Sequence, residues 1–177
     1  MQKSKGPAGR GVLFKSKVYE KVYEKRYPVL TPFEIPCRTM DIKKDNAMYM
    51  RIAHIAAERS YAKRLKVGCV IVKNHSIISF GWNGMPTGYD NCCEMEVDGK
   101  LVTRPEVQHA ELNAIAKLAE NGYSSKGAAI FITHSPCIHC ALLIQKCGIS
   151  QVFYHELYRS DEGLKFLERA GLEVHQL

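Results

Sequence analysis

The sequence lacks several features that would place it in other classes of protein. No apolar run approaches the roughly 18 residues that a membrane span requires, and the opening MQKSKGPAGRGVLFK lacks the apolar stretch of a secretory signal. We therefore expect a cytoplasmic protein with no membrane partner. The chain has seven cysteines, an odd number, and without a secretory signal these favour metal ligands, nucleophiles or core residues over disulfides.

An excess of positive charge is also missing from most of the chain. The net charge is +7, but residues 1–38 hold nine Lys or Arg and three Glu, whereas the remaining residues hold 16 basic and 15 acidic groups. A nearly neutral body is not the electrostatic footprint of a nucleic-acid-binding domain, so we expect no nucleic-acid partner. We interpret residues 1–40 as a basic, proline-containing N-terminal arm and residues 41–177 as the functional domain.

Regular secondary structure is predicted to begin after the arm. The segment DNAMYMRIAHIAAERSYA, which starts at Asp45, has Met48, Ile52, Ile55 and Ala56 at helical spacing behind an Asp/Asn cap, so it predicts a helix. The elements expected after it are a hairpin from the runs 67–72 and 76–82, a polar loop from Asn83 to about Val107, helices at 110–122, 137–148 and 161–171, and strands at 128–133, 151–155 and 172–177. This order predicts a three-layer α/β/α sandwich around a mixed five-stranded sheet, antiparallel in the hairpin and parallel in the later crossovers.

The stretch SPCIHC, residues 135–140, holds two cysteines where a helix is predicted to start. Taken alone, the pair fits half of a structural zinc knuckle, a redox dithiol, part of a catalytic metal site, or two buried thiols. A structural four-ligand site would need a second pair of ligands at short spacing, and the chain has no second C-x-x-C. Residues three apart share a helix face, and a helix N-terminus favours the thiolate, so Cys137 and Cys140 can converge on one ion.

A third ligand is available at the start of the preceding helix. In QHAELNAI, His109 opens that helix 28 residues before Cys137, and three protein ligands with an open fourth position are typical of a catalytic zinc site. Glu111, two residues on, does not share a helix face with His109, so we expect it to reach the reacting water rather than the metal. The pattern H-x-E…P-C-x-x-C is the known signature of zinc deaminases.

The wider sequence resembles the deoxycytidylate (dCMP) deaminases of the cytidine deaminase superfamily. The resemblance covers residues from about 45 to 177. It is carried by RS at 59–60, KVG at 66–68, GWNGMPTG at 81–88, NCC at 91–93, HAELNAI at 109–115, SPCIHC at 135–140, GI at 148–149 and Y…YR at 154–159. It implies a cytidine deaminase-like fold and hydrolytic conversion of dCMP to dUMP and ammonia. Zn²⁺ would be held by His109, Cys137 and Cys140, with Glu111 carrying protons.

The resemblance also implies contacts to the substrate. The backbone N–H groups of Ala110 and Cys137 would hold the cytosine carbonyl oxygen and the reacting water, and Asn83 would contact the sugar. The residues expected at or near the 5′-phosphate are Ser60, Arg64 and Tyr158. Ser135 has two readings, a substrate contact or a helix cap.

Regulation by nucleotides is a further implication of the resemblance. Relatives are often activated by dCTP with a divalent cation and inhibited by dTTP, at a site between subunits of a hexamer. The corresponding residues would be Gly81, Trp82, Asn83, Gly84 and Met85, with Mg²⁺ accompanying the effector. A purely structural turn over the active site is the alternative reading of this segment. The apolar look of the last strand and the family's precedent favour a hexamer.

Two other functions fit parts of the pattern. A nucleic-acid deaminase acting on tRNA adenosine or single-stranded DNA would need a basic surface around its pocket, which the balanced charge of the body does not indicate. A non-catalytic zinc-binding module would have no use for Glu111 beside an open coordination position. Some relatives bind a second, structural zinc, but residues 61–65 lack cysteine and no histidine lies between Cys93 and His109, so we predict none here.

Overall fold

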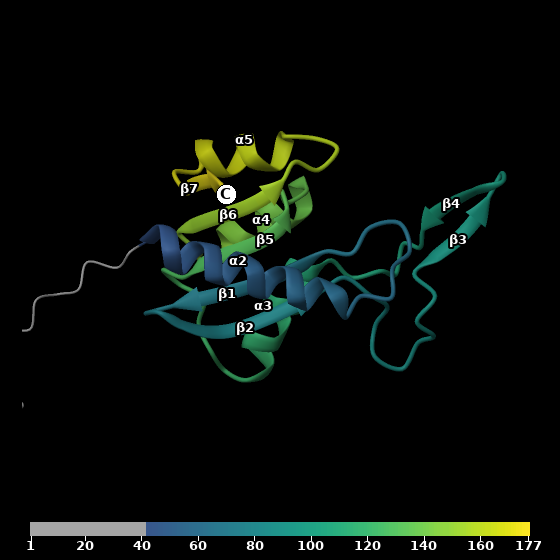
Figure 1. Ribbon diagram of the computed structural model, residues 1–177, viewed down its shortest axis with the longest axis horizontal. Helices are drawn as coiled ribbons and strands as arrows, with labels where there is room; N and C mark the ends of the chain where they lie inside the picture. The colour runs from purple at the N-terminus through teal and green to yellow at the C-terminus, as the bar shows by residue number, and fades with distance from the viewer. Residues whose placement is uncertain (1–41) are drawn as a thin grey trace, which may run out of the picture. The chain divides into compact units, whose positions relative to one another are not determined.

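The computed structural model describes residues 42–177, which form a five-stranded mixed sheet between helices (Figure 1). The predicted arm, residues 1–40, lies outside the described residues. The elements are α2 (Ile42–Glu58), β1 (Gly68–Lys73), β2 (Ser76–Trp82), β3 (Glu94–Val97), β4 (Lys100–Thr103), α3 (Ala110–Glu120), β5 (Ala129–His134), α4 (Ile138–Lys146), β6 (Gln151–Glu156), α5 (Glu162–Arg169) and β7 (Glu173–Gln176). Among residues 42–177, no helix combines the length and the apolar character needed to cross a bilayer.

The main sheet has the strand order β2-β1-β5-β6-β7. Strand β1 pairs antiparallel with both β2 and β5, whereas β5, β6 and β7 run parallel. Successive side chains of a strand point to opposite faces, so β1 contributes to both sides of the sheet. Val70 and Val72 pack under α2, while Cys69 and Ile71 pack with residues of α3, α4 and α5. The predicted α/β/α sandwich with a mixed five-stranded sheet is confirmed.

The first helix differs from its prediction in its start and its buried face. Helix α2 begins at Ile42, so Asp45 lies inside it rather than capping it. Met48 and Ile55, two of the apolar positions on which the prediction rested, are 46% and 60% exposed, while Tyr49, Met50 and Ala53 are buried. The helix lies so close to the sheet that a Cβ on Gly68 would meet the Ala53 carbonyl oxygen, so a small residue is needed at this contact. The predicted helix is confirmed, and its predicted cap at Asp45 is wrong.

A second hairpin, β3–β4, occupies the segment that was predicted to be a loop. It joins its strands through Asp98 and Gly99, both at positive φ, which is the backbone of a tight hairpin turn. Figure 1 shows it projecting from the rest of the described domain. The alternating pattern EMEVDGKLVT with a central Asp-Gly was the signal in the sequence, and the polar surroundings masked it.

The final strand is an edge strand with little burial. Strand β7 pairs with β6 on one side, and three of its four residues are exposed. In the single chain described, the apolar last strand that favoured a hexamer is largely exposed, and the hexamer stays a prediction. The strand's pairing direction, parallel to β6, is as predicted.

Helix α3 rests directly on β2 at Gly81. A Cβ built there would lie 2.4 Å from the Ala110 carbonyl oxygen and 2.7 Å from the Ala114 nitrogen, so only glycine leaves room for the backbone of the helix. Ser79, two residues earlier on the strand, donates a hydrogen bond to the Ala114 carbonyl at 2.7 Å. The start of α3 is thereby fixed against the sheet.

Substitution of Gly81 by alanine should therefore destabilise the protein. The added methyl group meets backbone atoms that cannot rotate away, and overpacking of this kind costs about 2 kcal/mol or more in the free energy of unfolding. Chemical denaturation measures the change. Gly84→Ala is the matched control, because a Cβ there has its nearest neighbour 4.0 Å away. Equal stability of the Gly81 and Gly84 variants would contradict the packing argument.

Candidate active site

Two helix N-termini on the same side of the sheet bring the predicted metal ligands together. His109 is the N-cap residue of α3 and Cys137 is the N-cap residue of α4, and neither side chain caps its own helix. Cys140 lies on the first turn of α4. The Nδ1 atom of His109 is 3.6 Å from the Cys137 Sγ and 3.3 Å from the Cys140 Sγ. One ligand atom from each of the three residues lies within 4.8 Å of the others.

These distances fit a tetrahedral zinc ion. Zinc–sulfur bonds of about 2.3 Å and zinc–nitrogen bonds of about 2.0 Å at tetrahedral angles separate the two donors by about 3.6 Å. Two sulfurs and one imidazole nitrogen are also the donor types that zinc prefers. Three ligands from the described part of the chain converge here, and a tetrahedral ion held by three protein ligands has a fourth position for water or substrate. His139, between the two cysteines, is exposed and stands apart from this ligand cluster (His109, Cys137 and Cys140).

The cluster is electrostatically prepared for a cation. The hydrogen bond with the Cys140 thiol, aided by His109, lowers the pKa of Cys137 to about 3, so this sulfur is a thiolate at neutral pH. The same bond and burial raise the pKa of Cys140. Hydrogen bonding to Cys137 raises the pKa of His109. The three groups therefore share protons that a metal ion would displace.

Glu111 lies beside the cluster in the first turn of α3. Its side chain is buried, with the residue only 4% exposed, and burial raises the pKa of its carboxyl group. His109 and a hydrogen bond with Cys140 act in the opposite direction. A buried carboxyl group beside the ligand cluster can accept a proton and release it again, which general acid–base catalysis requires.

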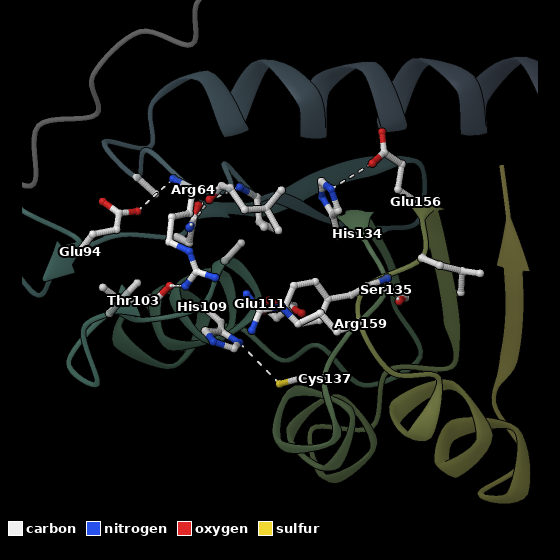
Figure 2. A pocket seen from close by; sticks show the side chains of 18 residues that line it. Arg64, Glu94, Thr103, His109, Glu111, His134, Ser135, Cys137, Glu156 and Arg159 are labelled. Carbon is white, nitrogen blue, oxygen red and sulfur yellow. Dashed lines mark hydrogen bonds and ion pairs between the residues drawn. The ribbon is translucent and has the colours of Figure 1, made fainter. Parts of the chain in front are cut away.

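A cavity of about 380 Å³ opens onto these groups (Figure 2). Its volume is in the range of small-molecule sites. The predicted residues that line it are Arg64, Asn83, His109, Ala110, Glu111, Ser135, Cys137 and Tyr158. Its walls come from the loop before β1, the base of the β3–β4 hairpin, the start of α3 and the ends of β5 and β6.

Comparison with known proteins agrees with this geometry. The model of the "Cytidine and deoxycytidylate deaminase zinc-binding region" matches residues 43–156. The chain belongs to this family.

Individual relatives extend the match. The chain is 35% identical over 136 residues to the ComE operon protein 2 of Bacillus subtilis, covering 75% of this chain and 70% of that protein. It is 34% identical over 165 residues to the deoxycytidylate deaminase of Enterobacteria phage T4, covering 71% and 86%. The crystal structure of the dCMP deaminase of cyanophage S-TIM5 in complex with dCMP and dUMP superposes with a TM-score of 0.72 at 42% identity, covering 76% and 97%.

Two residues predicted to contact the substrate, Asn83 and Ser60, make hydrogen bonds to the protein's own backbone. Asn83 accepts a hydrogen bond from the Val67 N–H at 2.8 Å and donates one to the Leu65 carbonyl at 2.9 Å, so it braces the loop before β1 while lining the cavity. Ser60 does not line the cavity. It is 2% exposed, and its hydroxyl donates to the Asn83 carbonyl at 2.8 Å, which places it behind Asn83.

Ser135 does not cap α4, because Cys137 occupies the N-cap position. Its hydroxyl instead accepts a hydrogen bond from the Tyr158 N–H at 2.7 Å, and it lines the cavity. The Tyr158 ring also lies 5.4 Å below the Arg159 guanidinium group. Contact of Ser60, Asn83, Ser135 and Tyr158 with a substrate stays a prediction.

The segment predicted to bind effectors packs against α3 and its preceding loop. Trp82 carries the Lys117 ammonium group 4.6 Å above its ring and the Arg59 guanidinium group 5.8 Å from its centre. Gly84 exchanges backbone hydrogen bonds with Gln108, next to His109. Met85 packs against a small buried group around Cys93. These contacts fix the segment beside the site, and its effector role stays a prediction.

Four polar residues of the cavity were given no role by the sequence analysis: Glu94, Thr103, His134 and Glu156. His134 and Glu156 are paired on adjacent parallel strands, and their side chains are 3.2 Å apart. Only their place at the carboxyl ends of predicted strands could have indicated them. Arg159, which also lines the cavity, was seen as part of the Tyr-Arg motif but given no role.

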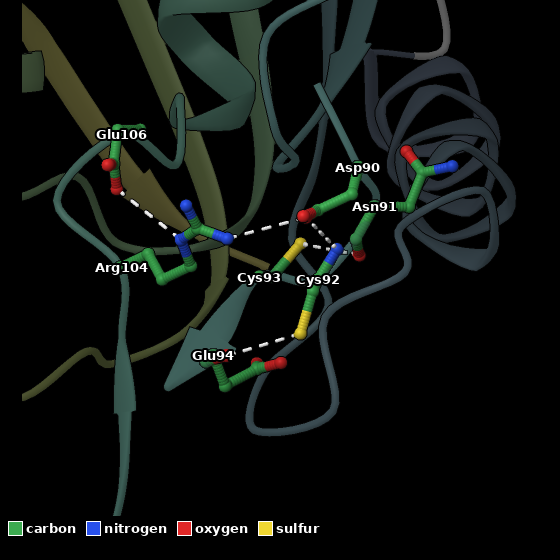
Figure 3. Close-up of polar contacts among 7 residues, drawn as sticks. All are labelled: Asp90, Asn91, Cys92, Cys93, Glu94, Arg104 and Glu106. Atoms are coloured by element: carbon green, nitrogen blue, oxygen red, sulfur yellow. Dashed lines mark hydrogen bonds and ion pairs between the residues drawn. The ribbon is translucent and has the colours of Figure 1, made fainter. Parts of the chain in front are cut away.

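The adjacent cysteines Cys92 and Cys93 lie apart from the ligand cluster (Figure 3). Their thiols donate to the backbone carbonyls of Glu94 at 3.3 Å and Asn91 at 3.7 Å, respectively. Arg104 closes the loop through Asp90, at 3.4 Å. Within residues 42–177, the ligand cluster is the one group of three or more such side chains close enough to hold a metal. The absence of a second zinc stays a prediction.

Removal of one cluster thiol should strip the protein of zinc. A serine hydroxyl remains protonated at neutral pH and is a poor zinc ligand, so we expect Cys140→Ser to hold only a small fraction of the wild-type metal after dialysis against a mild chelator. Elemental analysis measures zinc per chain. His139→Ala is the control from the same helix and should keep about one zinc per chain, as the wild type does. Full zinc in Cys140→Ser would refute the assignment.

Proposed function

We propose that the protein is a zinc-dependent dCMP deaminase, which hydrolyses dCMP to dUMP and ammonia. The observation that carries the proposal is one cavity that joins the ligand cluster and Glu111 to two arginines, Arg64 and Arg159. A neutral base can be converted beside the ligand cluster and Glu111 while the arginines hold an anionic group of the same molecule. The relatives named for deoxycytidylate deamination, and the bound dCMP and dUMP of the cyanophage protein, support the same substrate.

The protein's own residues would carry the chemistry as follows. Zinc bound by the ligand cluster would supply a water of lowered pKa and a Lewis acid. The Glu111 carboxylate takes a proton from the attacking water and delivers it to N3 of the cytosine ring, then transfers the second proton to the leaving amino group. Water and dCMP are consumed, dUMP and ammonia are released, and Glu111 returns to its starting state. The Ala110 N–H, at the start of α3, holds the cytosine carbonyl oxygen.

Recognition of a nucleotide rather than a nucleoside would rest on charge. Arg64 and Arg159 are exposed side chains whose guanidinium groups have no ion pair with any described residue. A guanidinium group matches the geometry of phosphate oxygens. Arg159 also stacks on Tyr158, which limits the directions it can take. Asn83 would position the sugar, with Ser60 holding Asn83 from behind.

Regulation and assembly are part of the proposal. We expect dCTP with Mg²⁺ to activate and dTTP to inhibit, through the segment 81–85, and we expect a hexamer. The packing of this segment against the residues just before His109 supports the idea, because a ligand held there would bear on the start of α3. We also expect a cytoplasmic location.

A substrate panel tests the proposed function. We expect ammonia release from dCMP at least about a hundredfold faster than from deoxycytidine, since the phosphate contacts are charge-assisted and are lost together. CMP, dCTP, a tRNA stem-loop and single-stranded DNA complete the panel, each with and without dCTP or dTTP and Mg²⁺. Inert dCMP with stoichiometric zinc, under every effector condition, would overturn the function. Saturation curves unchanged by either effector would remove the regulatory part alone.

Glu111→Gln separates chemistry from metal binding. The amide has nearly the same shape but cannot carry a proton, so we expect kcat to fall about a thousandfold while zinc per chain is unchanged. Steady-state kinetics and elemental analysis on the same preparation decide the outcome. A variant with wild-type kcat would show that another group moves the protons.

A further inference from the structure

The base of the β3–β4 hairpin contacts Arg64 at two points, its backbone N–H group and its guanidinium group. Glu94 and Thr103 are directly opposite each other in the hairpin and form its first pair. The Glu94 Oε1 atom accepts hydrogen bonds from the backbone N–H groups of Lys63 at 2.9 Å and of Arg64 at 3.1 Å. The Arg64 Nη1 atom donates to the Thr103 hydroxyl at 2.9 Å. One pair of residues thus fixes both the backbone and the head group of Arg64.

The burial of Glu94 sets this pair apart from the rest of the hairpin. Glu94 is 7% exposed, whereas Met95, Val97 and Leu101 are 42%, 43% and 52% exposed. A buried carboxylate must be compensated, and here two backbone N–H groups of the loop before β1 compensate it. The Glu94 carboxylate therefore accepts hydrogen bonds from the loop backbone, and it makes no ion pair with the Arg64 guanidinium group.

Within residues 42–177, no other hydrogen-bond partner holds the Arg64 guanidinium group, so its remaining donors can bind a ligand. Arg64, Glu94 and Thr103 all line the cavity that contains Glu111, and Figure 2 shows Arg64 reaching towards Thr103 above His109. A guanidinium group has five N–H donors, and Thr103 takes up one of its nitrogens. An exposed arginine otherwise loses considerable rotational freedom when it binds an anion, and a side chain already held in place loses less.

We propose that the Glu94–Thr103 pair is a positioning device that holds Arg64 ready for the 5′-phosphate and so makes the deaminase select nucleotides over nucleosides. The inference rests on the proposed function for its substrate, and it adds that the base of the hairpin positions Arg64. Glu94 and Thr103 do not touch the reacting atoms. They act through Arg64, so their loss should weaken phosphate recognition and leave the chemical step intact.

Thr103→Val is the decisive variant, because it keeps the shape and the β-branched character of the residue and removes only the hydroxyl. We expect KM for dCMP to rise about fivefold with kcat unchanged, and the Kd for dUMP measured by calorimetry to rise by a similar factor. Values for deoxycytidine and deoxyuridine, which have no phosphate, should not change. Thr103→Ser should restore wild-type values. Val102→Thr, the reverse exchange on the opposite face of the same strand, is the matched control.

A double variant that combines Thr103→Val with Arg64→Ala tests whether Thr103 acts on phosphate binding through Arg64. Once the guanidinium group is gone, adding Thr103→Val should cause no further loss of dUMP affinity. A Thr103→Val enzyme with wild-type dCMP KM and dUMP Kd, or one that loses deoxyuridine affinity to the same extent, would overturn the inference. A wild-type protein that does not turn over dCMP, but whose dUMP affinity still depends on Thr103, would overturn the proposed function and leave the positioning role standing.

Discussion

The active site depends on a backbone contact between a strand and a helix. At Gly81 the chain of β2 lies so close to the first turn of α3 that no side chain fits between them, and this contact fixes where α3 begins. Gly163 plays a matching part for α4, because a Cβ there would lie 2.2 Å from the Pro136 carbonyl oxygen, just before Cys137. The helix N-termini that supply the ligand cluster are therefore positioned by main chain packed on main chain, which has no rotamers to vary.

The position of these residues at helix N-termini explains which parts of the site were predictable from the sequence. His109, Glu111 and the two cysteines sit at the first turns of helices that follow strand or loop signals, and a helix start restricts the direction of its first side chains. Local spacing was thus enough to bring them together in the prediction. His134 and Glu156 belong to strands that are neighbours in space but not in the sequence, and their pairing depends on the sheet order.

The failures of prediction have separate physical causes. Helix α2 buries Ala53 because it lies against Gly68 of β1, and it also buries Tyr49 and Met50, so the spacing of Met48 and Ile55 did not locate its buried face. The β3–β4 hairpin was missed because most of its residues are exposed and polar residues surround its alternating pattern, while Glu94 at its base is buried against the loop before β1. Metal chemistry also overrides a local rule: His109 and Cys137 occupy N-cap positions without capping, a role that usually stabilises a helix by about 1 kcal/mol.

The Asp98–Gly99 turn has a practical consequence. It is the exposed end of the hairpin, and the pair that lines the cavity, Glu94 and Thr103, lies at the opposite end, three pairs from the Val97–Lys100 pair at the turn. Exposed loop tips are where proteins best accept foreign sequence. An epitope, a fluorophore-bearing cysteine or a whole reporter domain can therefore be inserted at this turn without entering the cavity.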